Sequence, residues 1–195
     1  MSARPRRPQL GLFGLEGDPA LPPGLIYRPD FLSGPEETAL LDRVRALPFA
    51  AVDFHGYTAH RRTVSFGWEY TFAGERLDKA GEIPEFLLPL RERAAAFAGL
   101  APRELEHVLV TEYRPGTPIG WHRDKAVFGD VIGISLLSSC TFRLRRKAGA
   151  KWQRAAFTAE PRSAYLLRGP ARTEWEHSIP AVETLRYSIT LRSLR

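Results

Sequence analysis

The chain has 195 residues, of which 44% are hydrophobic and 26% are charged. These fractions are close to those of globular proteins, so they argue against disorder along the whole chain and against a fibrous repeat. The single cysteine, Cys140, excludes an internal disulfide and favours a reducing, cytoplasmic setting. The longest uncharged run, 131–142, is shorter than the roughly 20 apolar residues that a membrane-spanning helix needs.

The net charge is +6, from 28 Lys and Arg against 22 Asp and Glu. An excess of this kind favours a polyanionic partner such as nucleic acid. Six cations fall in a stretch without any acidic residue: Arg143, Arg145, Arg146, Lys147, Lys151 and Arg154. This stretch either contacts the nucleic-acid backbone, with Arg143, Arg145 and Arg146 as the candidates, or forms the solvated outer face of a strand pair.

Two segments have the pattern of helices. The first begins at Ser33, which opens a Ser-x-x-Glu capping box, and ends before Pro48. The second spans 85–98 and is followed by Gly99, a residue typical of helix C-termini. Pro89 falls inside this second segment and weakens the prediction of its first turn.

The rest of the chain has the pattern of strands. The aromatic residues Phe66, Trp68, Tyr70 and Phe72 alternate with smaller or polar residues, which is the period of a strand. Seven short runs rich in β-branched and aromatic residues follow after residue 100: 107–113, 131–137, 141–146, 155–158, 164–167, 175–178 and 187–192. No helical pattern separates these runs, which argues against parallel βαβ units. We therefore expect an α+β fold that is mainly β, an antiparallel sandwich or jelly roll with the two helices packed outside one sheet.

The motif His122-Arg123-Asp124 places an imidazole and a carboxylate two residues apart. On a strand or an extended loop, such residues point to the same side. His177, in another expected strand, could supply a third ligand. Two imidazoles and one carboxylate form the ligand set of non-haem Fe(II) oxygenases. A His-x-Asp motif is common by itself, and a lone histidine is usually structural, so this reading needs support from elsewhere in the chain.

Arg186 and Arg192 are six residues apart, so on one strand both side chains face the same side. Guanidinium groups that point into a barrel need an anion, and their forked geometry suits a carboxylate. Tyr113 precedes a turn, and its phenol could donate a hydrogen bond to the same anion. Taken singly, these residues also fit two surface arginines and a core tyrosine.

The order of these features resembles that of the AlkB family of Fe(II)- and 2-oxoglutarate-dependent dioxygenases. The resemblance extends over 104–195 and consists of Thr111-Glu112-Tyr113-Arg114-Pro115-Gly116, His122-Arg123-Asp124, His177, Arg186 and Arg192. It implies a double-stranded β-helix with Fe(II), 2-oxoglutarate and dioxygen as cofactors. The implied metal ligands are His122, Asp124 and His177, with no catalytic residue beyond them. The implied cosubstrate-binding residues are Arg186, Tyr113, Arg192, Thr111 and Ser188.

The chain departs from the family pattern at three positions. Thr111 and Ser188 stand where the family often has asparagine. Ala126 stands where well-characterised repair members have an acidic residue that reads the damaged base. These departures leave the implied metal and cosubstrate sites unchanged, but they leave the lesion undetermined.

The resemblance implies oxidative demethylation of alkylated bases in DNA or RNA, a repair activity that releases formaldehyde. Residues 1–22 are rich in Arg, Pro and Gly, which predicts a flexible arm. We expect one AlkB-like domain at 23–195, in which 23–103 carries the helices and a nucleotide-recognition lid and 104–195 the β-helix core. The implied substrate-binding residues in and near the lid are Tyr57, Arg61, Arg62 and Trp68. The alternating aromatic residues of this region also fit one buried strand face, and the arginines also fit an exposed loop.

Two other functions stay open. One keeps the iron chemistry but acts on a protein side chain or a small molecule. The other is a non-catalytic jelly roll that binds nucleic acid through its basic stretch. We expect a cytoplasmic monomer with nucleic acid as its partner and no membrane association.

Overall fold

The computed structural model describes residues 21–54, 57–71 and 76–195 of the chain. The expected arm at 1–22 therefore lies almost entirely outside the described residues. The elements are β1 (Leu25–Arg28), α1 (Gly34–Arg45), β2 (Ala50–Phe54), β3 (Tyr57–Phe66), β4 (Trp68–Thr71), β5 (Arg76–Lys79), the 3₁₀ turn η1 (Glu85–Leu87), α2 (Leu88–Ala98), the 3₁₀ turn η2 (Pro102–Glu104), β6 (Leu105–Tyr113), β7 (Ile119–His122), β8 (Phe128–Leu136), β9 (Cys140–Ala148), β10 (Lys151–Ala159), β11 (Ala164–Leu167), α3 (Gly169–Thr173), β12 (Glu176–Ile179) and β13 (Arg186–Leu194).

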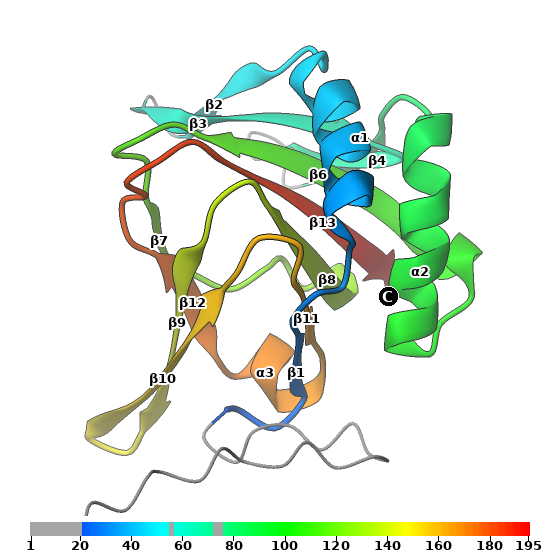
Figure 1. The fold of residues 1–195 in the computed structure, drawn as a ribbon. Coiled ribbons are helices and arrows are strands. Elements are labelled where there is room, and N and C mark those ends of the chain that lie inside the picture. The colour runs from blue at the N-terminus through cyan, green and yellow to red at the C-terminus, as the bar shows by residue number, and fades with distance from the viewer. Residues whose placement is uncertain (1–20, 55–56, 72–75) are drawn as a thin grey trace, which may run out of the picture.

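Within the described residues, the strands form two main sheets and a small hairpin. The large sheet has seven strands in the order β1-β11-β8-β13-β6-β3-β2, the small sheet has the order β10-β9-β12-β7, and β4 pairs with β5. All these pairings are antiparallel. Figure 1 shows α1 and α2 on one side of the large sheet and the small sheet on the other. The prediction of a jelly roll with two helices packed on one sheet is confirmed.

Both predicted helices are present. At the start of α1, the Ser33 hydroxyl accepts a hydrogen bond from the backbone N–H of Glu36, and the Glu36 carboxylate accepts one from the backbone N–H of Ser33. Helix α2 begins at Leu88, three residues later than expected. Proline in an α-helix clashes with the carbonyl four residues before it, so Pro89 keeps residues 85–87 in a 3₁₀ turn. No helix in the described ranges is long and apolar enough to cross a membrane.

The side chains of β13 alternate between two faces of the large sheet. One face packs under the helices, and the other faces the small sheet. Tyr187, Ile189 and Leu191 pack into the apolar cluster that includes α1 and α2. The alternate residues of β13 face the small sheet instead. These alternate residues are polar: Arg186, Ser188, Thr190 and Arg192.

The expected single strand at 66–72 is wrong, because Gly67 breaks it. Gly67 has a φ of +75°, and a Cβ at this position would lie 2.0 Å from the carbonyl oxygen of Glu106. The chain therefore turns here, so that Phe66 ends β3 in the large sheet and Trp68 begins the hairpin β4-β5. Phe72 lies outside the described residues.

Replacing Gly67 by alanine is expected to lower the free energy of unfolding by about 2 kcal/mol or more, because the new Cβ meets backbone and the φ is unfavourable. Urea unfolding measures the change. Gly81→Ala is the matched control, since no atom lies within 4 Å of its Cβ position. Equal losses in the two variants would contradict this account of the break.

Candidate metal and cosubstrate site

A cavity of about 780 Å³ opens between the large and small sheets. This volume is within the range of roughly 300–1,000 Å³ that is typical of small-molecule sites. Polar residues from both sheets line it, among them Arg61, Thr63, His107, Thr111, Tyr113, His122, Asp124, His177, Thr190 and Arg192. Most of the residues that the sequence motifs single out therefore meet in one place.

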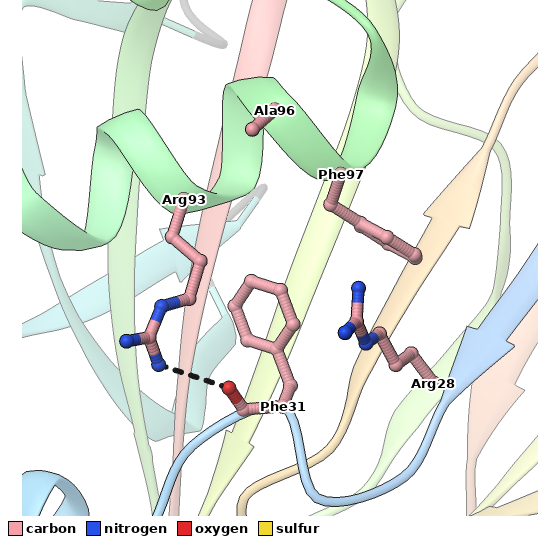
Figure 2. Close-up of a pocket in the computed structure, with 5 residues that line it drawn as sticks. All are labelled: Arg28, Phe31, Arg93, Ala96 and Phe97. Carbon is pink, nitrogen blue, oxygen red and sulfur yellow. Dashed lines mark hydrogen bonds between the residues drawn. The ribbon is translucent and has the colours of Figure 1, made fainter.

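A smaller hollow of about 290 Å³ lies between α2 and the segment that links β1 to α1 (Figure 2). It is lined by Arg28, Phe31, Arg93, Ala96 and Phe97. Arg93 donates a hydrogen bond to the backbone carbonyl of Phe31 at 3.0 Å and pairs with Glu36 at 2.6 Å. These contacts join α2 to the start of α1. Since the lining includes neither imidazole nor carboxylate, this hollow offers no metal ligands.

The three expected metal ligands lie together in the large cavity. His122 and His177 are directly opposite each other on β7 and β12, with their ring centroids 4.3 Å apart. Asp124 follows β7, and its Oδ2 lies 3.7 Å from Nε2 of His177. This distance is too long for a hydrogen bond, so the two atoms face each other across a gap.

The three side chains lie near one another, but their donor atoms are not placed to coordinate one metal ion. In the described part of the chain, no group of three or more His, Cys, Asp or Glu side chains is placed so that it could hold a metal ion as it stands. The donor set itself fits Fe(II), because two imidazoles and one carboxylate leave coordination positions open for a cosubstrate.

Hydrogen bonds and packing prepare both imidazoles as ligands. Nδ1 of His122 lies 2.9 Å from the backbone oxygen of Gly120. Because a carbonyl only accepts, Nδ1 carries the proton and Nε2 has the free lone pair. The His177 ring stacks on Phe142 at 5.2 Å. Burial, followed by the proximity of His122, lowers the pKa of His177 to about 3, so this imidazole is neutral, as metal binding requires.

Arg192 holds Asp124 in its charged form. Its Nε and Nη2 donate to Oδ1 of Asp124 at 2.9 and 2.8 Å. Burial alone would raise the pKa of Asp124, but the guanidinium of Arg192, together with other nearby groups, outweighs burial and keeps that pKa below its usual value. Oδ1 is thus occupied, and Oδ2 is turned toward His177.

His107, which the motifs did not single out, supports Arg192 from the other side. Its Nδ1 lies 3.2 Å from Nη1 of Arg192. A guanidinium only donates, so Nδ1 of His107 accepts, and the proton of this imidazole is on Nε2. Burial, and then the charge of Arg192, lowers the pKa of His107 to about 3, which keeps the ring neutral. Arg192 is therefore fixed between an imidazole and the expected ligand Asp124.

Arg186 is a buried cation that forms no ion pair with the described residues of the chain. It is 1% exposed. Nε and Nη2 donate to the hydroxyl of Ser135 at 3.2 and 3.1 Å, while Nη1 is buried and has no hydrogen-bond partner among the residues that the structure describes. No ion pair joins Arg186 to a carboxylate of the described residues. An unpaired buried charge is costly, so this guanidinium fits a carboxylate ligand.

The other expected cosubstrate residues surround Arg186 and the cavity. Tyr113 pairs with Arg186 between β6 and β13, and its ring lies 4.8 Å from the guanidinium. The Ser188 hydroxyl donates to the Tyr113 hydroxyl at 3.4 Å, and Thr111 is opposite Ser188. Arg186 does not itself line the cavity; it packs against Tyr113, which does.

Arg61 and Arg62 lie on opposite faces of β3. Arg61 lines the cavity. Arg62 forms a two-point ion pair with Glu112, with Nε–Oε1 at 2.8 Å and Nη2–Oε2 at 2.9 Å, and lies over the Phe49 ring at 5.7 Å. Phe49 packs against the apolar cluster under the helices, so the expected substrate contact of Arg62 does not fit its position. Successive side chains of a strand point to opposite faces of the sheet, which is why Arg61 lines the cavity and Arg62 packs on the other face.

The structure shows the side chain of one of the two aromatic residues expected to bind substrate, Trp68, but not that of Tyr57. The indole N–H of Trp68 donates to Glu106 at 3.3 Å, and Trp68 is not among the residues that line the cavity, whereas its neighbours Glu69 and Tyr70 are. The backbone of Tyr57 begins β3, but its side chain lies outside the described residues.

The three arginines expected to contact nucleic acid lie on β9. Arg145 pairs with Glu176 at 2.6 Å, and Arg146 pairs with Glu174 at 2.5 Å. Arg143 donates to the hydroxyl of Ser178. Two of the three charges are therefore already balanced by carboxylates that lie far along the chain.

Sequence reasoning missed three residues that support the site. Ser135 accepts hydrogen bonds from Arg186, and the sequence feature that could have indicated it is a hydroxyl residue within an otherwise apolar strand. His107 holds Arg192, and it stood at the edge of an expected strand. Arg172 is buried and donates to the backbone oxygens of Lys125 and Phe128, so it fixes the segment after Asp124. Arg172 lies in a segment with no motif, so no sequence signal could have found it.

The fold and this set of side chains define a class of enzyme. The chain matches the sequence model of the 2OG-Fe(II) oxygenase superfamily over residues 24–192, and it belongs to that superfamily. Members use Fe(II), 2-oxoglutarate and dioxygen, so the predicted cofactors are confirmed.

Individual relatives narrow this class to the AlkB family, to which the chain belongs, as its motifs predicted. It is 31% identical over 199 residues to the "Alkylated DNA repair protein ALKBH8 homolog" of Arabidopsis thaliana, across 89% of this chain and 56% of that protein. It is 28% identical over 173 residues to the "tRNA (carboxymethyluridine(34)-5-O)-methyltransferase ALKBH8" of Mus musculus, across 85% of this chain and 25% of that protein. The chain thus spans about half of the first relative and a quarter of the second.

A solved structure has the same fold. OsALKBH1 superposes with a TM-score of 0.69 at 16% identity, and the match covers 89% of this chain and 98% of that one. At this level of identity the likeness concerns the fold alone.

The opposite orientations of Arg61 and Arg62 predict effects of different size on stability. Arg62→Met is expected to lower the free energy of unfolding by about 2 kcal/mol, because Glu112 loses its main partner in a mostly buried position. Arg61→Met removes the same charge one residue earlier and should change stability by less than about 0.5 kcal/mol. Urea unfolding of both variants gives the comparison, and a larger loss for Arg61→Met would refute the assignment of faces.

Proposed function

We propose that this chain is an oxygenase that oxidises the N-methyl group of an alkylated base of DNA or RNA and releases it as formaldehyde. The observation that carries the proposal is the buried guanidinium of Arg186, with Nη1 unpartnered, next to a cavity where His122, Asp124 and His177 converge. A non-catalytic binding module has no need for a buried cation that lacks an anion.

The side chains around the cavity have separate roles in binding the metal and the cosubstrate. His122, Asp124 and His177 would hold Fe(II), and Arg192 keeps Asp124 ionised and in place. Arg186 binds one carboxylate of 2-oxoglutarate beside Tyr113. When bound, Fe(II), 2-oxoglutarate and dioxygen supply the oxidising power, and 2-oxoglutarate leaves as succinate and carbon dioxide. The protein needs no general base of its own.

The apolar part of the cavity lining shields the reaction from water. Val131, Phe142, Leu167 and Ile179 line the cavity between the two sheets. Their side chains belong to the second apolar cluster, and Phe142 of this cluster stacks on His177. Exclusion of water protects an oxidising site from side reactions, which is what this wall provides.

Two charged residues that line the cavity suit a nucleotide. Ala126 lacks the carboxylate expected at its position, but Glu69 of β4 lines the same cavity with an exposed side chain. Its carboxylate can accept a hydrogen bond from an amino group of a flipped base. Arg61 lines the cavity on β3 and suits a phosphate.

The names of the relatives support nucleic acid as the substrate, since one refers to alkylated DNA and one to tRNA. The methyltransferase activity in the name of the mouse protein does not enter the proposal, because the chain spans a quarter of that protein. Ala126 stands where repair members of the family have an acidic residue that reads the damaged base. For this reason a protein side chain or a small molecule is the second candidate substrate.

The function is tested with Fe(II), 2-oxoglutarate and a panel of methylated single- and double-stranded DNA and RNA oligonucleotides, followed by mass spectrometry of the products. We expect loss of the methyl group together with succinate formation. Succinate formation that no oligonucleotide stimulates would reject nucleic acid in favour of the second candidate.

The metal ligands are tested within the same assay. His122→Ala should abolish iron binding and turnover, because it removes one of three ligands. Arg123→Ala is the matched control, since Arg123 is exposed and lies between two ligands without being one. A His122→Ala variant that kept half of the wild-type rate would refute the metal assignment.

Arg186→Met is expected to abolish stabilisation by 2-oxoglutarate without weakening the free protein. Ligand at about 100 times its Kd stabilises a protein by about 2.7 kcal/mol, so wild type with Mn²⁺ in place of Fe²⁺ should show a shift near this size. The unliganded variant should be at least as stable as wild type, because it removes an unpaired buried charge. Thermal unfolding with and without 2-oxoglutarate measures both effects. A variant that 2-oxoglutarate still stabilises would contradict the role of Arg186.

A further inference from the structure

The side of the small sheet that faces away from the cavity carries aromatic rings and cations. Since His122, Leu144 and His177 turn inward, their neighbours along each strand turn outward. The outward residues are Trp121 on β7, Glu176 and Ser178 on β12, Arg143, Arg145 and Lys147 on β9, and Trp152 and Arg154 on β10. We refer to these residues as the outer face.

Guanidinium groups and indole rings alternate across the outer face. The Arg145 guanidinium lies 4.4 Å from the ring centroid of Trp121 and 4.4 Å from that of Trp152, so it is held between two indoles. Arg145 also pairs with Glu176 at 2.6 Å, which balances its charge. The Arg145 side chain is therefore fixed between the two rings, and its contact with Trp152 holds that indole in position.

Trp152 is nevertheless one of the large apolar residues that remain exposed, at 40%. It lies on β10, the edge strand of the small sheet, where its outward neighbours Arg154, Ala156 and Thr158 are exposed as well. An exposed indole that is fixed in place needs little ordering when a flat ring stacks on it.

Cations without carboxylate partners surround this indole. No ion pair within the described residues involves Lys147, which is opposite Trp152, or Arg154, and both are exposed. Arg143 donates to the hydroxyl of Ser178 and lies 5.2 Å from the Trp121 ring. A fixed aromatic ring with unbalanced cations beside it is the combination that binds single-stranded nucleic acid, through base stacking and phosphate contacts.

The outer face begins at the cavity. Trp121 precedes His122 on β7, the other edge strand of the small sheet, and lines the cavity while it contacts Arg145. A strand with one base in the cavity therefore reaches Trp121 first and Trp152 after it.

We propose that the outer face binds the single-stranded segment next to the base in the cavity, with one base stacked on Trp152 and phosphates on Arg154 and Lys147. The identity of this segment rests on the proposed function, but its binding is measured without turnover. An acidic peptide would suit the cations, but it has no flat ring for the exposed indole, so the observations favour nucleic acid.

The test measures binding of a labelled, unmodified single-stranded oligonucleotide of about 12 nucleotides by fluorescence anisotropy. Trp152→Ala should raise Kd about tenfold. Arg154→Ala should lower the slope of log K against log salt by about one, the change expected for one lost phosphate contact. The matched controls are Leu88→Ala, an equally exposed apolar residue on α2, and Arg103→Ala, an exposed arginine on η2. Both should stay within about twofold of the wild-type Kd.

The outcomes separate this inference from the proposed function. Trp152→Ala and Leu88→Ala variants that bind equally well would overturn it, and so would displacement of the oligonucleotide by a polyglutamate peptide at an equal concentration of charge. Succinate formation without oligonucleotide should be unchanged in Trp152→Ala, because Trp152 does not line the cavity. If Trp152→Ala weakens binding while no methylated oligonucleotide is turned over, the outer face stands and the proposed function fails.

Discussion

The ion pair between Asp124 and Arg192 is the contact on which the arrangement of the site depends. Asp124 follows β7 of the small sheet, and Arg192 belongs to β13 of the large sheet, so this pair joins the two walls of the cavity. A buried ion pair adds little net stability because both charges lose their hydration, but removing either partner leaves a buried charge behind. The pair therefore fixes where the walls can lie, and with them the distance between the imidazoles on one side and Arg186 on the other.

The same strand β13 serves both the core and the site because its residues alternate. Ile189 and Leu191 face the helices, while Arg192 on the other side of the strand lines the cavity and Arg186 packs there against Tyr113. A shift of one residue in the pairing of β13 with β6 would move both arginines under the helices and the apolar residues into the cavity. The helices α1 and α2 thus have a functional role: by covering one face of the large sheet, they leave the other face for polar chemistry.

Much of the fold could be predicted from local patterns, and the rest depends on contacts between distant residues. The seven strand runs after residue 100 and both helices followed from periodicity and capping, and the ligands converge as their spacing indicated. Strand β3 was missed because its polar sequence, with Arg61 and Arg62 in succession, has no alternating pattern. Its strand structure comes from pairing with β6, and the partner of Arg62 is Glu112, 50 residues away. The break at Gly67 depends on the backbone of Glu106, which no pattern near Gly67 reveals.

The charge of a surface is likewise a property of the fold and not of a stretch of sequence. The run from 143 to 154 has six cations and no acid, yet Glu174 and Glu176 reach two of them from β12 and the segment before it. Among the cations that form no ion pair with the described residues, Lys147 is opposite the exposed Trp152 and Arg154 is opposite Arg145, two residues along β10 from Trp152. Since the inward residues of the same four strands carry the histidines, one small sheet offers an iron ligand set on one face and a polyanion surface on the other. The edge strand β7 is where the two meet, because Trp121 and His122 are consecutive residues there.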